Sequence, residues 1–212
     1  SLVYAFSENF ILPLSHDEVV HVKGSIVNKM SGEYEDKFAG ERILLAFMFA
    51  HPGKKLNFMG YEVAQFKEWN YNAGIDLFLA DEFPLHRKMR EFVKNLNFYY
   101  RDCKALYEID YSWDGFEWLV VDDNYHNLLA FSRYSKNGES LTCIINFSGV
   151  ELTQYPIGVD EGKYRIVLNT DEIRFGGTGK LRKKVFSTSK ASGSKRFSIQ
   201  IDIPRLTCIY LI

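Results

Sequence analysis

The sequence has few cysteines, almost no net charge and no long apolar run, and each of these shortages excludes a class of protein. It contains three cysteines in 212 residues. An odd number of widely spaced cysteines does not suit a disulfide framework, so we expect Cys103, Cys143 and Cys208 to be reduced thiols that pack among apolar neighbours. The net charge of −1 does not indicate a nucleic-acid or membrane partner.

Membrane insertion and secretion also lack a signal in the sequence. No apolar run approaches the length of a membrane span, and the N-terminus lacks the basic, apolar and small-residue order of a signal peptide. We therefore expect a cytoplasmic protein. With 46% hydrophobic and 25% charged residues, the composition is that of a soluble globular chain with room for one or two cores.

The stretch "LPLSHDEVVH" carries the densest group of chemically active side chains. Histidines and carboxylates at short spacing suggest a zinc site, but the helical zinc-protease motif places its two histidines four residues apart. His16 and His21 are five apart and would lie about 140° apart around a helix. We expect neither a metal nor another cofactor.

The residues before this motif predict a different arrangement. Residues 10–14 are a short apolar run in which Pro13 disfavours helix, so they predict a buried strand. His16 and Asp17 would then lie at the carboxyl end of a strand, where parallel α/β enzymes place their catalytic groups. The alternative is that Asp17 or Glu18 only caps the next element.

Up to about residue 105 the pattern predicts two strand-then-helix units. The strand at 10–14 precedes a buried helix at about 34–51, which Pro52 and Gly53 terminate. Residues 55–59 predict a second strand, and Pro84 suits the first position of a helix with one apolar face. That face consists of Leu85, Met89, Phe92, Leu96, Tyr99 and Cys103.

After about residue 106 the hydrophobic period changes to two, as in antiparallel strands. Strands are predicted at 116–121, 128–134, 141–147, 164–168, 197–203 and 207–211. The segment "KNGE" contains an Asn-Gly signal for a tight hairpin between the second and third of these strands. Residues 106–212 are therefore predicted to form an antiparallel β-sandwich domain.

A parallel sheet is normally covered on both faces, and two strands are too few to make such a sheet. A (β/α)8 barrel needs about 250 residues, so the first half has room for roughly a quarter of one. The predicted fold is therefore α/β plus all-β: residues 1–105 as the C-terminal portion of a TIM (β/α)8 barrel, its last two β/α units, followed by the sandwich. Exposed barrel strands would allow the chain to self-associate.

Several stretches resemble one known family. "ENFILPLSHDEVVHVKGSIVNKMSGEY", "HPGKKLNFMGYEVAQFKEWN", "FPLHRKMREFVKNLNFYYRDCKALYEID" and "GFEWLVVDD" resemble the C-terminal third of bacterial 1,4-alpha-glucan (glycogen) branching enzymes, in the alpha-amylase superfamily (glycoside hydrolase family 13). Ser15 occupies a position that is typically Asn in amylases. The sequence also departs from the residues typical of this family. It has Val22 where the family usually has Gly, Ser31 where it usually has Pro, and Val63-Ala64 where Phe-Gly is common.

The resemblance implies a function and a role for each residue of the motif. Family members cut an α-1,4 link by double displacement and transfer the glucan segment to a 6-hydroxyl, a retaining transfer. Asp17 matches the third catalytic carboxylate, which stabilises the transition state, and His16 matches a donor to the same sugar. The nucleophilic Asp and the acid/base Glu are expected upstream of residue 1, so this chain alone is expected to be inactive.

Other residues have both a binding and a structural interpretation. Trp69 and Tyr71 would stack on glucose rings or pack within their loop. Glu62 and Gln65 are expected at the rim of the active site, where they would contact substrate. Glu18 and His21 are expected to support the loop.

The segment from residue 173 to residue 200 contains eight basic residues and no acidic one. We interpret it as a solvated hairpin loop, because a neutral glucan does not require cations. "FGGTGK" resembles a phosphate-binding loop only superficially, since Arg174 and Leu181 stand where that motif requires Gly and Ser or Thr.

Two classes of function remain open from the sequence. The chain is part of a branching enzyme acting on α-glucans, with another glucan hydrolase of the superfamily as the alternative enzyme. It could instead be a non-catalytic glucan-binding module. The length of the transferred chain and the oligomeric state are not encoded in any motif.

Overall fold

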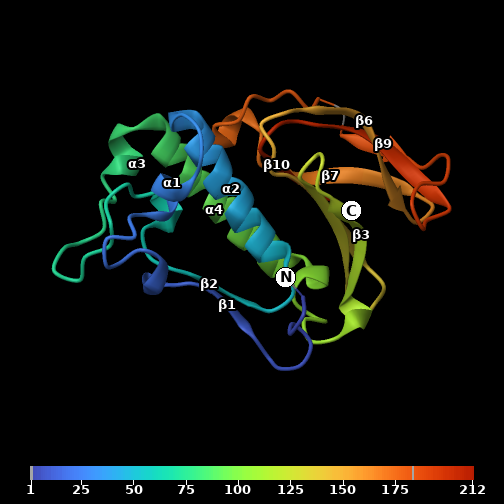
Figure 1. Cartoon of the computed structure of the whole chain (residues 1–212), viewed down its shortest axis with the longest axis horizontal. Coiled ribbons are helices and arrows are strands. Elements are labelled where there is room, and N and C mark those ends of the chain that lie inside the picture. The colour runs from blue at the N-terminus through green and yellow to red at the C-terminus, as the bar shows by residue number, and fades with distance from the viewer. Residues whose placement is uncertain (1, 183) are drawn as a thin grey trace.

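The computed structural model describes residues 2–182 and 184–212. A group of helices covers one face of a six-stranded antiparallel sheet, and a two-stranded sheet covers part of the other face (Figure 1). The parallel strands β1 and β2 lie on the far side of the helices from this sheet (Figure 1).

β1 (Ile11–Leu14) and β2 (Lys54–Asn57) form a parallel pair, in which Ile11 lies opposite Lys54. This confirms the two strands predicted at 10–14 and 55–59. The expectation that the first is buried is wrong, because Ile11 is 58% exposed and no residue of β1 is fully buried. Among the described residues β1 pairs only with β2, so its other edge is open.

The connection between β1 and β2 contains α1 (Ile26–Lys29) and α2 (Tyr34–Ala50). α2 is the predicted helix, and none of its residues from 41 to 50 is exposed. It ends where expected, because His51 precedes Pro52 and adopts an extended backbone (φ −65°, ψ 144°).

After β2 the chain forms α3 (Leu79–Glu82) and α4 (Pro84–Asp102), which begins at Pro84 as predicted. Met89, Phe92 and Leu96 of its predicted apolar face are fully buried. Five short 3-10 helices complete the helical elements of the described residues: η1 (His16–Glu18), η2 (Tyr61–Val63), η3 (Lys104–Leu106), η4 (Trp113–Gly115) and η5 (Ile173–Phe175).

The large sheet contains five of the six strands predicted after residue 106. Its strands, in spatial order, are β3 (Phe116–Asp123), β4 (Leu128–Tyr134), β5 (Ser140–Asn146), β10 (Thr207–Leu211), β7 (Lys163–Asn169) and β8 (Val185–Ser187). The predicted hairpin joins β4 to β5, with Gly138 at φ +80° in its turn. β8 was not predicted, because three residues carry too little alternation to mark a strand.

The second sheet pairs β6 (Leu152–Val159) with β9 (Phe197–Ile203). β9 matches its prediction, whereas β6 was missed because Pro156 interrupts its pattern. Ile157, Ile199 and Ile201 pack against Leu128, Ile144 and Ile209 of the large sheet. The predicted β-sandwich is therefore present, with a second sheet of only two strands.

The main core crosses the predicted domain boundary. Side chains of α2 and α4, among them Phe38, Leu45 and Phe92, share one cluster with Phe131 and Tyr210 of the large sheet. Polar contacts cross at the same place: the Tyr210 hydroxyl donates to the carbonyl of Ala46, and Arg42 Nε donates to the carbonyl of Thr170 (2.9 Å).

The three cysteines are free thiols, as predicted. Cys143 and Cys208 are fully buried on neighbouring strands with their sulfurs 3.6 Å apart, whereas Cys103 is only partly buried. Among the described residues, no helix combines the length and apolar character needed to cross a membrane.

Candidate functional site

His16 and Asp17 lie in the first turn after β1, where the sequence placed them. Ser15 caps this turn by accepting a hydrogen bond from the Asp17 amide (3.4 Å). His16 Nε2 lies 3.3 Å from Asp17 Oδ1, and the two side chains are 55% and 73% exposed. An imidazole and a carboxylate are thus presented together to solvent at the carboxyl end of a parallel strand.

Trp69, in the loop after β2, lies beside this pair. Its ring is 6.4 Å from the ring of His16 and 5.3 Å from that of Phe58, both in edge-to-face geometry. The Trp69 amide also donates to the carbonyl of Val19 (3.1 Å). The structure therefore brings together two of the predicted substrate-binding residues, while Tyr71 extends into solvent, 81% exposed.

Glu62 and Gln65 both make local hydrogen bonds in the loop after β2. Glu62 accepts a hydrogen bond from the amide of Gly60 (2.8 Å). Gln65 Oε1 accepts one from the amide of Asp76 (2.8 Å), and its Nε2 donates to the carbonyl of Lys67 (3.2 Å). These bonds organise the loop, so substrate contact by either residue stays a prediction.

Glu18 and His21 were predicted to support the loop. The Glu18 carboxylate lies 3.9 Å from Lys29 Nζ, which also donates to the Glu18 carbonyl. His21 lies at φ 58°, at the start of a turn in left-handed conformation. Both positions belong to the loop that carries Asp17, and their supporting role stays a prediction.

Sequence reasoning did not identify Glu68. Its carboxylate accepts hydrogen bonds from the amide of Val22 (3.1 Å) and the amide of Gly24 (2.7 Å). These two backbone bonds hold the pKa of Glu68 below its usual range. Together with the bond from Trp69 to Val19, they join the loop after β1 to the loop after β2.

Sequence reasoning also missed Glu41, on the buried helix α2. Its side chain is fully buried, and neither carboxylate oxygen has a hydrogen-bond partner among the described residues. Burial raises the pKa of Glu41 well above its ordinary value, the charge of Glu62 raises it further, and Arg42 opposes the shift. Glu41 lines a small cavity with Tyr61 and Trp69.

The described residues contain no group of three or more His, Cys, Asp or Glu side chains arranged to hold a metal ion.

The segment "FGGTGK" turns around a carboxylate. Asp171 accepts hydrogen bonds from the amide and hydroxyl of Thr178 (both 2.7 Å) and from the amide of Lys180 (3.3 Å). A carboxylate therefore already occupies the place where a phosphate would need amide donors.

Part of the basic segment is paired with acidic groups outside it. Lys180 lies 2.6 Å from Glu151, and Lys195 lies 2.8 Å from Glu117 and 2.9 Å from Asp160. These ion pairs connect the segment to neighbouring parts of the β domain, so Lys180 and Lys195 already have acidic partners.

Chemically, the arrangement at the end of β1 can supply an exposed carboxylate, an imidazole and an aromatic edge to one ligand. Such groups suit recognition of a polyhydroxylated molecule, because carboxylates and imidazoles exchange hydrogen bonds with hydroxyls and aromatic surfaces contact apolar C–H groups. Asp17 and His16 alone do not form a nucleophile and acid pair.

Comparison with known proteins identifies the class of the β domain. Residues 118–212 match the family described as alpha amylase, C-terminal all-beta domain. Two solved structures share the fold: a debranching enzyme from Nostoc punctiforme (TM-score 0.55, 13% identity, 82% of this chain and 30% of that one) and an alpha-amylase from H. orenii (TM-score 0.54, 14%, 95% and 38%).

Curated relatives extend the likeness over the whole chain. It is 45% identical over 213 residues to the 1,4-alpha-glucan branching enzyme GlgB of Halothermothrix orenii, which covers 99% of this chain and 34% of that protein. It is 46% identical to the same enzyme of Aquifex aeolicus, over 100% of this chain and 34% of that protein. The predicted resemblance to bacterial branching enzymes is confirmed, and the chain spans about a third of the length of these relatives.

Proposed function

We propose that this chain is part of a 1,4-alpha-glucan branching enzyme, which cleaves an α-1,4 link and transfers the glucan segment to a 6-hydroxyl with retention. The observation that carries this proposal is the identity of 45–47% to GlgB branching enzymes over nearly the whole chain. The proposed partner is an α-glucan, and the proposed location is the cytoplasm.

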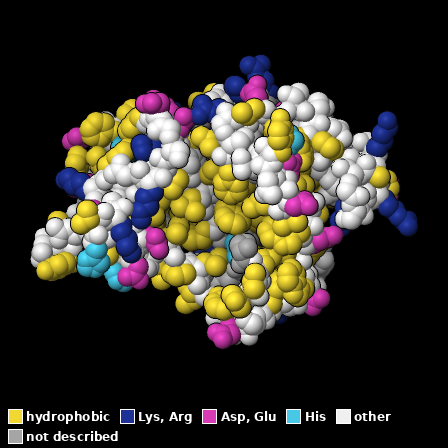
Figure 2. Space-filling model, viewed as in Figure 1, with side chains coloured by type: hydrophobic (Ala, Val, Ile, Leu, Met, Phe, Trp, Pro, Cys, Tyr) yellow, Lys and Arg dark blue, Asp and Glu magenta, His cyan; other side chains and the backbone are white. Residues whose placement is uncertain are grey.

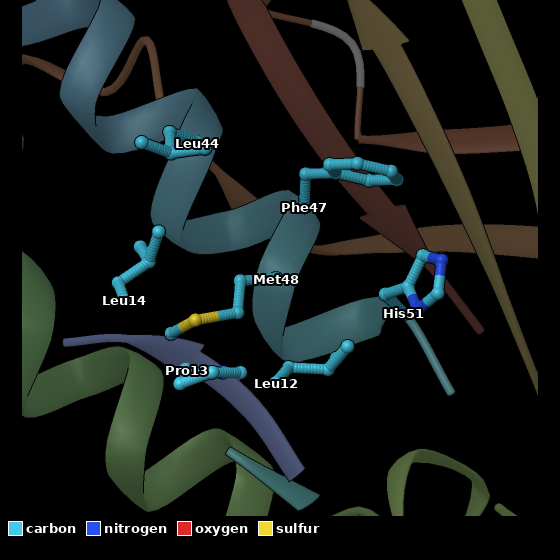
Figure 3. Close-up of a pocket in the computed structure, with 7 residues that line it drawn as sticks. All are labelled: Leu12, Pro13, Leu14, Leu44, Phe47, Met48 and His51. Carbon is cyan, nitrogen blue, oxygen red and sulfur yellow. The ribbon is translucent and has the colours of Figure 1, made fainter. Parts of the chain in front are cut away.

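Residues 1–105 are proposed to be the last two β/α units of the catalytic barrel, and residues 106–212 its C-terminal β domain. The parallel pairing of β1 with β2 through the buried helix α2 supports this assignment. The open edge of β1 supports the same assignment. Leu12 and Leu14 line an apolar groove with Leu44, Phe47 and Met48 of α2 (Figure 3).

Hydrophobic side chains gather in the middle of the face seen in Figure 2, over α2 and beside β1. A neighbouring barrel strand would pair with the open edge of β1 and cover these side chains. Self-association through the same edge is the proposed alternative when that strand is missing.

Within this assignment Asp17 is proposed as the carboxylate that stabilises the transition state, with His16 as a donor to the same sugar. Both lie exposed at the carboxyl end of β1, where barrel enzymes assemble their sites. The nucleophile and the acid/base are proposed to come from other barrel strands. Glu62, Gln65 and Trp69 are proposed substrate contacts at the rim.

The test is to incubate the intact protein with amylose and to analyse the product. Branching lowers iodine staining and creates chains that an α-1,6-specific debranching enzyme releases, without a matching rise in reducing ends. A rise in reducing ends that parallels the loss of staining would instead identify a hydrolase. Glucan binding without any change in the polymer would identify a binding module.

A further inference from the structure

The loop that carries Asp17 contains strained backbone. His21, Val22 and Gly24 all have positive φ, of 58°, 67° and 73°. Val22 is the least suited to this conformation, because its β-branched side chain crowds the backbone there. That side chain is 97% exposed, so it gains no packing that would offset the strain. Something else must hold the turn in place.

The carboxylate of Glu68 makes the contacts that hold this turn. Its two oxygens each accept one amide hydrogen, from Val22 and from Gly24, across 46 and 44 residues of sequence. Backbone amides that converge on one anion form a recurrent type of anion-binding turn. Here the anion is a side chain from the loop after β2.

A second contact connects the turn to the backbone of Asp17. Lys23, which lies between the two amides that Glu68 binds, donates from its Nζ to the carbonyl of Asp17 (2.6 Å). The conformation of residues 21–24 therefore fixes the direction from which the Lys23 side chain approaches the carbonyl of Asp17. A change at Glu68 would move Lys23 and, through it, the backbone of Asp17.

We infer that Glu68 is a positioning residue for Asp17, acting through the strained turn at Val22–Gly24 and Lys23. This inference rests on the function proposed for Asp17. The ionised carboxylate is required, because a glutamine has only one oxygen acceptor and would direct an amide N–H at the second backbone donor.

The test compares Glu68→Gln and Glu68→Asp in the intact enzyme. Displacing a catalytic group by about 1 Å costs roughly a hundredfold in rate, so Glu68→Gln should lower kcat by about 10- to 100-fold with little change in KM. Glu68→Asp keeps the charge and should recover part of kcat. Glu151→Gln is the matched control, since Glu151 pairs with Lys180 in the β domain, and it should leave kcat unchanged.

Two further measurements separate positioning from a general structural role. In an Asp17→Asn background Glu68→Gln should cause no further loss of kcat, because a residue that acts through Asp17 has nothing left to position. Hydrogen exchange of the intact protein should show faster exchange at residues 19–25 in Glu68→Gln. Equal losses from Glu68→Gln in both backgrounds, or an unchanged kcat in Glu68→Gln, would overturn the inference.

The proposed function and this inference fail differently. If Asp17→Asn itself retains a rate near that of the unmodified enzyme, the role of Asp17 is wrong and the inference falls with it. If Asp17→Asn is inactive while Glu68→Gln has full activity, the function stands and only the positioning role is wrong.

Discussion

The guanidinium of Arg133 lies 2.7 Å from the carboxylate of Asp110, and both side chains are fully inaccessible to solvent. Arg133 also donates to the carbonyls of Ala50 (2.8 Å) and Gly115 (3.0 Å). Lys54, at the start of β2, makes a second ion pair with Asp110 (2.8 Å). These contacts join β2 and the end of α2 to β4 of the large sheet.

We predict that Asp110→Asn lowers the free energy of unfolding by about 3–5 kcal/mol, because it leaves the buried charge of Arg133 without its counter-ion. Urea denaturation at neutral pH measures the change. Asp102→Asn is the control, since Asp102 pairs with Arg101 on the exposed surface, and its midpoint should not move. Equal shifts in the two variants would show that the buried pair contributes no more to the free energy of unfolding than the exposed pair does.

A second prediction concerns the unpartnered carboxyl of Glu41. Replacing it with leucine should raise the free energy of unfolding by about 1–3 kcal/mol at neutral pH, because a desolvated polar group without hydrogen bonds is removed. Thermal unfolding of the two proteins in parallel measures the difference. A loss of stability in Glu41→Leu would mean that the carboxyl has a partner that stabilises it.

The pH dependence of this effect has a definite sign. The pKa of Glu41 is raised in the folded protein, so the folded state keeps a proton that the unfolded state releases above about pH 4.5. Glu41 therefore lowers stability progressively as pH rises from that value toward the folded pKa. Glu41→Gln should abolish this decline, and the advantage of Glu41→Leu should shrink as pH falls to 4.5.

A third prediction follows from the backbone of Val22. Val22→Gly should raise the free energy of unfolding by about 1 kcal/mol, because glycine adopts φ 67° without the steric cost that an L side chain incurs. Val150→Gly is the control, as Val150 is also exposed, at 66%, but is not among the residues with positive φ. If both variants lose stability, the turn at Val22 is not strained.

A fourth prediction is that the 212-residue chain by itself neither branches nor hydrolyses amylose. The role proposed for Asp17 is to stabilise a transition state that forms only when a nucleophile and a proton donor act on the same bond. The measurement is turnover of amylose by the purified chain, with the intact enzyme as the positive control. Turnover that follows the chain through purification, and that Asp17→Asn abolishes, would contradict the prediction.

The elements that sequence patterns predicted well are those whose own residues decide their structure. α4 begins at its proline, and β4, β9 and β10 span the ranges predicted for them, with most of their residues buried. β6 was missed because Pro156 obscures its period. The burial of β1 was predicted wrongly, since the exposure of Ile11 depends on which strands lie beside it and not on its own sequence.

The same distinction applies to the candidate site. His16 and Asp17 were predictable because the strand that precedes them fixes their place. Val22 and Ala64 stand at positions where the resemblance implies glycine, and both have positive φ, of 67° and 49°. Glu68 and Glu41 were not predictable, because the amides and the cavity that they face belong to segments distant in sequence. Folding brings them together.

The role proposed for Asp17 in glucan transfer is tested most directly by measuring new α-1,6 links in amylose treated with the intact enzyme and with its Asp17→Asn variant. We predict that the variant keeps its fold and its glucan affinity but loses several orders of magnitude in kcat, because it removes only the charge that is proposed to stabilise the transition state. Proton NMR resolves α-1,6 from α-1,4 anomeric signals, and circular dichroism checks the fold. Formation of α-1,6 links by Asp17→Asn at a rate near that of the unmodified enzyme would contradict the assignment of the site at the end of β1.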